Sequence, residues 1–244
     1  MEVHAHTHTP QKKWTHYLWE FFMLFLAVFC GFLAENQREH LVEQQREKQF
    51  MRSMVEDLTS DTMEIKKILS AIDTSQANID SMLLLFTAAN VTNASVIRSY
   101  QFTFPALNNI PIVFNDRTIT QLKNSGSMRL IHNQKVNDAL ISYWKHIEII
   151  TRTQERHSSY RIRGREMETR IFNTAEIFFK NNGRIAKPSL PVHLINSDIA
   201  LIKEYANVVA YCGVMLGALY TQEKEQNELA IELIGLIKKE YHLK

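Results

Sequence analysis

Histidines alternate with other residues near the amino terminus, at His4, His6 and His8. Neutral imidazoles spaced in this way can bind a transition metal, so the three histidines form a weak candidate metal site in a tail. The rest of the chain offers no pattern of cysteine, histidine or carboxylate ligands. We therefore expect no metal or cofactor in the folded protein.

Arginines concentrate in the stretch 152–170, which contains six of them. Such a run forms either a solvated, salt-bridged helix face or a patch that binds an anion, a lipid headgroup or an acidic partner. The residues of this candidate patch are Arg152, Arg156, Arg161, Arg163, Arg165 and Arg170.

One carboxylate, Glu20, interrupts the otherwise apolar stretch 17–34. Its side chain either reaches back to a membrane interface or pairs with a basic group on a partner helix inside the membrane. Glu20 is therefore a candidate intramembrane partner contact.

The apolar stretch itself predicts a membrane anchor. As a helix, residues 17–35 span roughly 28 Å, close to the roughly 30 Å of a bilayer's hydrocarbon core. Trp14, Tyr17 and Trp19 supply an aromatic belt at one end. A cleaved signal peptide is the competing interpretation, but the small residues that precede a cleavage site are missing.

We assign 1–16 to a tail, 17–36 to the anchor and 37–244 to a folded domain. A second span through 205–220 is a weaker alternative, because it contains Asn207 and is short.

Prolines are absent from long intervals of the remaining chain, and those intervals predict helices at 37–87, 116–125, 134–181 and 198–242. Asn133 and Ser197 are suitable N-caps, and Gly183 suits a helix C-terminus. Apolar residues follow alternating steps of three and four in each long helix, which is typical of a coiled-coil-like seam. In the first helix the seam positions are 51, 55, 58, 62, 65, 69, 72, 76, 79, 83 and 86, and all of them are apolar except Thr62 and Gln76. The fold class is therefore all-α, with the anchor continuing into an elongated antiparallel three-helix bundle plus a short helix.

The connection between the first two long helices has only weak strand signals, at 99–104 and 110–114. If it is an end loop, the second helix turns back along the first, so that Phe86 lies near Val136. Arg161, Arg163 and Arg165 would then lie beside Glu56, Asp57 and Asp61.

Ser125 and Gly126 interrupt the helical pattern and predict a structural turn. The alternative is a ligand pocket, walled by Phe102, Phe104, Phe114 and the segment around Met128.

Composition excludes few classes of protein. A net charge of +2 with 45% hydrophobic residues is ordinary for a folded chain, and gives no reason to expect a nucleic-acid partner. The two cysteines, Cys30 and Cys212, cannot form a disulfide framework.

Two segments resemble a bacterial family of single-pass membrane proteins of unknown function. The first runs from EFFMLFLAV at 20–28 to GFLAEN at 31–36 and REH at 38–40, followed by REKQF at 46–50 and EDL at 56–58. The second, LKNSGSMRLI at 122–131, matches the family pattern L-K-x-S-G-x-x-x-L-I, and the last helix, ending ELIGLIKKE at 232–240, is similar too. The resemblance implies the fold and membrane attachment, and it implies no reaction or ligand.

Orientation depends on two opposing signals. Basic residues within about 20 positions of the anchor favour a cytoplasmic domain, with Lys12 and Lys13 before it and Arg38, Arg46, Lys48 and Arg52 after it. The signal-anchor layout and the resemblance favour the opposite. We expect a bacterial inner-membrane protein whose C-terminal domain is periplasmic.

The function we expect is that of a non-catalytic, membrane-anchored helical module, because the polar residues form no nucleophile and base pair. It would act as a scaffold or a subunit of a membrane complex, in contact with the bilayer and with a protein partner or a second copy. The alternative is a ligand-sensing extracytoplasmic bundle, and an enzyme is the less favoured third class.

Overall fold

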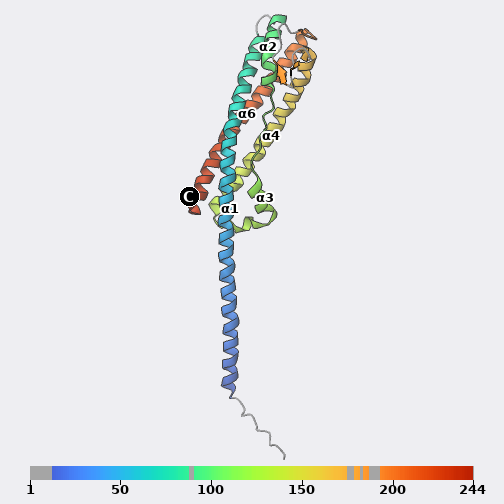
Figure 1. Cartoon of the computed structure of the whole chain (residues 1–244). Helices are drawn as coiled ribbons and strands as arrows, with labels where there is room; N and C mark the ends of the chain where they lie inside the picture. Colours follow the sequence, from blue (N-terminus) through green and yellow to red (C-terminus); the bar gives the residue numbers. More distant parts are fainter. Residues whose placement is uncertain (1–12, 88–90, 175–178, 182–183, 187–192, 244) are drawn as a thin grey trace, which may run out of the picture. The chain divides into compact units, whose positions relative to one another are not determined.

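The computed structural model describes residues 13–87, 91–174, 179–181, 184–186 and 193–243. Regular structure in these residues is almost entirely helical, which confirms the all-α class (Figure 1). The chain divides into two compact units, residues 1–50 and residues 51–244. Helix α1 (Trp14–Phe86) contributes residues to both units.

The first unit contains the predicted anchor as part of α1. Every residue from 13 to 41 is exposed, although 17–34 is almost wholly apolar. No residue in the most apolar window of α1 is buried. A long apolar helix with an exposed surface is the feature that a membrane span or a signal sequence requires.

The second unit is built on one buried stripe of α1. The stripe includes six residues of the predicted seam, namely Met51, Leu58, Ile65, Ile72, Ile79 and Phe86. Its other positions, 54, 61, 68, 75 and 82, are each one residue earlier than predicted. The difference has a physical cause, because Asp61 and Ser75 are buried with hydrogen-bond partners and so interrupt the apolar pattern without leaving the core.

Helix α2 (Asn93–Ala106) occupies a segment whose strand-like composition was misleading. Thr92 and Ser95 form a capping box at its start, each side chain accepting a hydrogen bond from the other's backbone N–H. The hydroxyl groups of Ser99 and Thr103 donate to carbonyls of the same helix, so both side chains are satisfied in the core. The strand signal at 99–104 is therefore wrong.

The chain after α2 runs back along α1. Pro105 accepts a hydrogen bond from Ser75, Asn115 donates its N–H to Asp61, and Thr118 donates to Asp57. Residues 107–116 therefore descend past successive turns of α1 before α3 (Arg117–Asn124) and the 3₁₀ helix η1 (Ser127–Leu130). Ile110 and Ile112 are buried while residues 111 and 113 are exposed, so this segment is extended and half-buried.

Helix α4 (Gln134–Ile171) begins where predicted, since the Asn133 side chain accepts a hydrogen bond from the N–H of Val136. It ends ten residues earlier than predicted, because Phe172 is buried in extended conformation and bridges to Leu194. The short antiparallel strands β1 (Phe179–Asn181) and β2 (Arg184–Ala186) follow. The predicted C-terminal Gly183 lies outside the described residues.

Helix α6 (Ile199–Glu240) is the third long helix. Its N-cap is Asp198, one residue later than predicted, and its side chain accepts from the N–H of Ala200. Tyr205, Val209, Cys212 and Leu216 are buried in the core. Packing thus accounts for part of the apolar character of residues 205–220, and 44% of the most apolar window of this helix is buried.

The direction of the second long helix corrects the predicted topology. The ring of Tyr205 lies 5.8 Å from that of Phe86 and 6.4 Å from that of Phe172, so the ends of α1 and α4 meet at the start of α6. Tyr143, near the start of α4, bonds to Asp61. Helix α4 therefore runs parallel to α1, and α6 runs antiparallel to both. The prediction that Phe86 lies near Val136 is wrong because residues 93–116 return along α1 before α4 begins.

Candidate functional site

A layer of polar side chains crosses the core of the second unit. Asp57 and Asp61 come from α1, Tyr143 from α4, and Glu223 and Gln226 from α6, and all five are buried. Polar groups in such a position require hydrogen-bond partners, and those partners define what the layer does.

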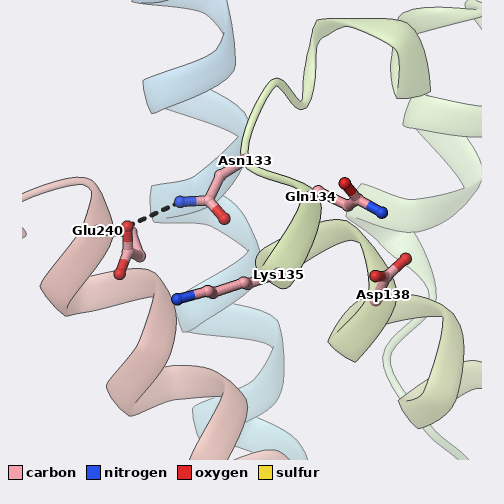
Figure 2. A pocket seen from close by; sticks show the side chains of 5 residues that line it. All are labelled: Asn133, Gln134, Lys135, Asp138 and Glu240. Atoms are coloured by element: carbon pink, nitrogen blue, oxygen red, sulfur yellow. Dashed lines mark hydrogen bonds between the residues drawn. The ribbon is translucent and has the colours of Figure 1, made fainter.

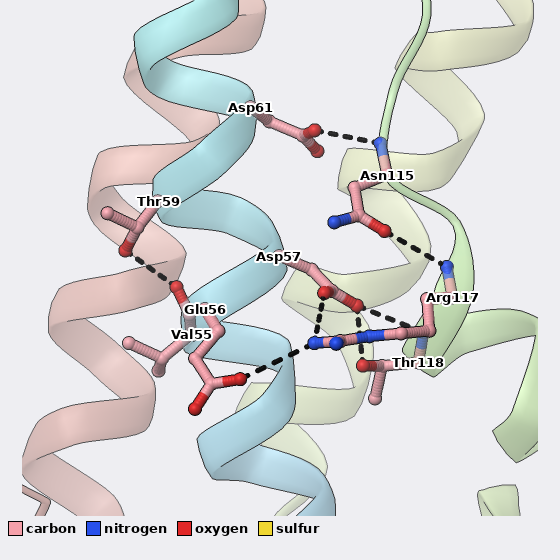
Figure 3. A network of polar contacts seen from close by, with 8 residues as sticks. All are labelled: Val55, Glu56, Asp57, Thr59, Asp61, Asn115, Arg117 and Thr118. Carbon is pink, nitrogen blue, oxygen red and sulfur yellow. Dashed lines mark hydrogen bonds and ion pairs between the residues drawn. The ribbon is translucent and has the colours of Figure 1, made fainter.

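Asp57 fixes the start of α3 on α1 (Figure 3). Its carboxylate accepts a hydrogen bond from Arg117 Nη2 at 2.7 Å and from the Thr118 backbone N–H at 3.0 Å, and it also accepts from the Thr118 hydroxyl. The N-cap residue Asp116 makes no side-chain cap, so Asp57 satisfies a free N–H of α3 from another helix. The neighbouring Glu56 is exposed and lies 3.4 Å from the same guanidinium.

Asp61 joins α4 and the returning segment to α1. It accepts the backbone N–H of Asn115 and the Tyr143 hydroxyl, each at 2.8 Å. Burial raises the pKa of the Asp61 carboxyl, while those two hydrogen bonds act in the opposite direction. Burial beside Asp61 also raises the pKa of the Tyr143 phenol, which stays a hydrogen-bond donor.

The layer continues to α6 through an amide. Gln226 Oε1 lies 2.7 Å from His146 Nδ1, and Gln226 Nε2 donates to the carbonyl oxygen of Tyr143 at 3.4 Å. Since an amide oxygen only accepts, the imidazole carries a proton on Nδ1. The other ring nitrogen of His146 lies 3.2 Å from the exposed Glu225.

Glu223 is the least satisfied member of the layer. It is fully buried, and neither carboxyl oxygen has a hydrogen-bond partner among the residues that the structure describes. Burial, reinforced by the charge of Asp61, raises the pKa of the Glu223 carboxyl from 4.5 to about 7. At slightly acidic pH Glu223 is therefore a neutral acid in the core.

This burial predicts that Glu223 destabilises the domain as pH rises from about 4.5 to about 7. The folded-state pKa is higher than the unfolded one, so the stability is fully present below pH 4.5 and is lost as pH rises through about 7. Replacing Glu223 with Gln should remove this loss. We compare the free energy of unfolding of the variant with that of wild type at two pH values. The difference between the two proteins should increase in favour of the variant by about 2 kcal/mol from about pH 5.5 to about pH 8.

The measurement is urea unfolding at both pH values, monitored by circular dichroism. Burial lowers the pKa of His157 to about 4, but that group is present in both proteins and cancels in the comparison. Asp61 is likewise present in both wild type and the variant. Parallel pH profiles for the two proteins would contradict the assignment.

The structure divides the predicted arginine patch into two groups. Arg152, Arg156, Arg163 and Arg170 are exposed on α4, and Arg161 and Arg165 are half-buried. The spacing of the exposed group, 152, 156, 163 and 170, places it on one helix face.

Two of the arginines, the half-buried Arg165 and the exposed Arg163, form ion pairs within the domain. Arg165 pairs with the buried Glu168 at 2.8 Å, donates to the carbonyl oxygen of Phe104 at 2.6 Å, and lies over the Phe104 ring. Arg163 pairs with Glu204 of α6. The predicted pairing of Arg161, Arg163 and Arg165 with residues 56–61 is therefore wrong, because α4 runs in the other direction.

The two remaining candidates have local roles. Gly126 adopts a left-handed conformation with φ of 66°, and Ser125 donates its hydroxyl proton to Gln121 O, so the predicted turn is present. Glu20 lies 3.0 Å from His16 on the preceding turn of α1. A contact of Glu20 with a partner helix stays a prediction.

Described residues of the second unit line at least two hollows. Figure 2 shows the first, a hollow of about 460 Å³ where Asn133 donates from its side-chain amide to Glu240 at 2.7 Å, joining the start of α4 to the end of α6. Its walls are polar. The second has a volume of about 220 Å³ and lies between α3, η1 and α4, where Met128 meets Leu140 and Trp144. Phe102, Phe104 and Phe114, expected as walls of a pocket with Met128, do not line it.

Within the described ranges, no three histidine, cysteine, aspartate or glutamate side chains are grouped to hold a metal ion. His4, His6 and His8 precede those ranges.

Comparison of the chain with protein-family models, curated proteins and solved structures gives no match. The family resemblance therefore stays a prediction, and function must be inferred from the chain's own physical features.

Sequence reasoning missed Asp57, Asp61, Glu223 and Gln226 as core residues. A signal for the α6 pair was present, because the buried positions 216, 219, 223, 226, 230 and 233 keep the three-and-four spacing across them. Asp57 and Asp61 had no such signal, since their burial depends on residues 115–118 and 143, which are far away in the sequence.

Proposed function

We propose that this chain is a non-catalytic helical module held by one membrane anchor, and that it serves as a scaffold or a subunit of a membrane complex. The membrane is the bacterial inner membrane, and the C-terminal domain is periplasmic. One observation carries the proposal: the most apolar window of α1 is 0% buried, whereas that of α6 is 44% buried. The apolar residues of α6 have a packing role, and those of 17–34 require an environment outside the chain.

The polar layer supports a structural role for the folded domain. Asp57 and Asp61 accept hydrogen bonds from backbone N–H groups, a guanidinium and two hydroxyls, which fixes α3 and α4 against α1. These interactions specify the position of each helix rather than activate a nucleophile. The exposed arginine face of α4 is a suitable surface for an acidic protein partner or a second copy.

Charges placed in the anchor are expected to release the protein from membranes. Each aspartate at the centre of a membrane helix raises the insertion free energy by about 2.5–3.5 kcal/mol, so Phe25→Asp with Val28→Asp should prevent stable insertion. The measurement is the fraction of protein that stays with membranes after carbonate extraction. Wild type should stay in the pellet and the double variant should not.

A matched control places the same two charges on exposed apolar positions of the domain. Leu84 and Val214 are 73% and 60% exposed, so Leu84→Asp with Val214→Asp should leave membrane attachment unchanged. Retention of the anchor variant at the level of this control would contradict the proposal.

A ligand-sensing module is the second candidate function. It is favoured by the cavity beside Trp144, which has apolar walls and two lysines.

A further inference from the structure

The cavity between α3, η1 and α4 has an apolar floor. Ile119, Met128 and Leu140 line it, together with the indole of Trp144. Its volume of about 220 Å³ lies below the roughly 300–1,000 Å³ of pockets for drug-sized molecules. A molecule with a single ring or a short branched chain is the size that it can hold.

Two lysines give the cavity a positive character. Lys123 and Lys145 line it with one carboxylate, Glu148. Lys123 Nζ lies 5.8 Å from the centroid of the Trp144 ring, and neither Lys145 nor Glu148 makes a hydrogen bond or ion pair with another described residue. Lys123, Lys145 and Glu148 are all exposed, so the surplus charge of one positive unit lies where the cavity meets solvent.

Trp144 adds an unsatisfied donor. Its indole N–H is buried and has no hydrogen-bond acceptor within the described part of the chain. A buried indole N–H normally has an acceptor, so this site lacks one.

We propose that the cavity binds a small organic anion with an apolar body, of the class of aromatic carboxylates. The body would contact Ile119, Met128 and Leu140 and lie against the Trp144 ring. The carboxylate would take its charge partners from Lys123 and Lys145. It could also supply the acceptor that the indole N–H lacks, which requires the side chains that cover this N–H to move. An amine of the same shape would meet two like charges. This inference is independent of membrane attachment, because all the residues belong to the second unit.

The test is a fluorescence titration of the full chain in detergent. Trp14→Phe and Trp19→Phe leave Trp144 as the only tryptophan, so its emission reports on the cavity alone. The probes are phenylacetate, 2-phenylethylamine with the same ring and opposite charge, and acetate with the same head group and no ring. We expect saturable binding of phenylacetate, with each of the other two at least about tenfold weaker.

Charge-neutral variants identify the residues responsible. Lys123→Gln and Lys145→Gln should each weaken phenylacetate binding by about five- to tenfold. Lys135→Gln is the matched control, since Lys135 lies on the same helix α4 as Lys145 but lines the other hollow, and it should bind as wild type does. Melting curves identify a variant that fails to fold, in which case the other lysine variant provides the test.

Three results would overturn the proposal. These are a Trp144 signal that phenylacetate does not change, equal binding of phenylacetate and 2-phenylethylamine, and lysine variants that bind like Lys135→Gln. A chain that proves soluble without detergent would be titrated in buffer with the same expected outcome, so failure of the anchor proposal leaves this test valid.

Discussion

Replacing Tyr205 with alanine is expected to lower the free energy of unfolding of the second unit by about 3–5 kcal/mol. Tyr205 is fully buried where α1, α4 and α6 meet, and its ring packs edge-on against those of Phe86 and Phe172, at interplanar angles of 65° and 72°. Removing the ring leaves a cavity among three helices and removes two aromatic contacts. Urea unfolding followed by circular dichroism measures the change.

Another tyrosine of the same helix provides the control. Tyr211 is 56% exposed, and its ring is stacked on that of Tyr160 at 5.4 Å. Tyr211→Ala should therefore lower the free energy of unfolding by less than about 1.5 kcal/mol. Equal losses for the two variants would show that the helices do not meet at Tyr205.

Replacing Asp57 with alanine should lower the free energy of unfolding by about 3 kcal/mol. The substitution leaves the Thr118 N–H and hydroxyl without their acceptor, and it removes the buried partner of Arg117. Since these contacts hold α3 on α1, amide hydrogen exchange should also rise in residues 117–124.

Glu56 is the matched control, because it is adjacent to Asp57 and pairs with the same arginine from the surface. Its side chain is 71% exposed, so Glu56→Ala should change stability by less than about 1 kcal/mol. A similar loss for both variants, or unchanged exchange in α3 of Asp57→Ala, would contradict the role given to Asp57.

The parts of the fold that depend on local chemistry could be predicted from sequence. Asn133 marks the start of α4, Gly126 marks the turn after α3, and the three-and-four spacing identifies all three long helices. Each signal lies within a few residues of the feature that it predicts.

The parts of the fold that depend on contacts between distant residues could not be predicted from sequence. Five of the eleven positions of the buried stripe of α1 lie one residue earlier than predicted, because Asp61 and Ser75 are polar and their partners lie at positions 115, 143 and 105. The direction of α4 depended on residues 93–116, whose composition indicated weak strands while Thr92 and Ser95 capped a helix. The cavity beside Trp144 follows from that same return of the chain, which places α3 against α4.

Cysteine labelling tests the central claim most directly, because both natural thiols have defined surroundings. Cys30 lies in the apolar stretch of α1, and Cys212 is buried in the core. Met63→Cys adds a thiol at a position that is 57% exposed on the folded domain. Intact bacterial spheroplasts that express this variant are treated with a membrane-impermeant maleimide, and the modified positions are read by mass spectrometry.

The account predicts modification at position 63 in intact spheroplasts, with Cys30 and Cys212 unmodified until the protein is solubilised and denatured. Modification at position 63 only after lysis would place the domain in the cytoplasm. Modification of Cys30 in intact spheroplasts or in untreated membranes would show that residues 17–34 do not lie in the bilayer, and it would contradict the proposed anchor.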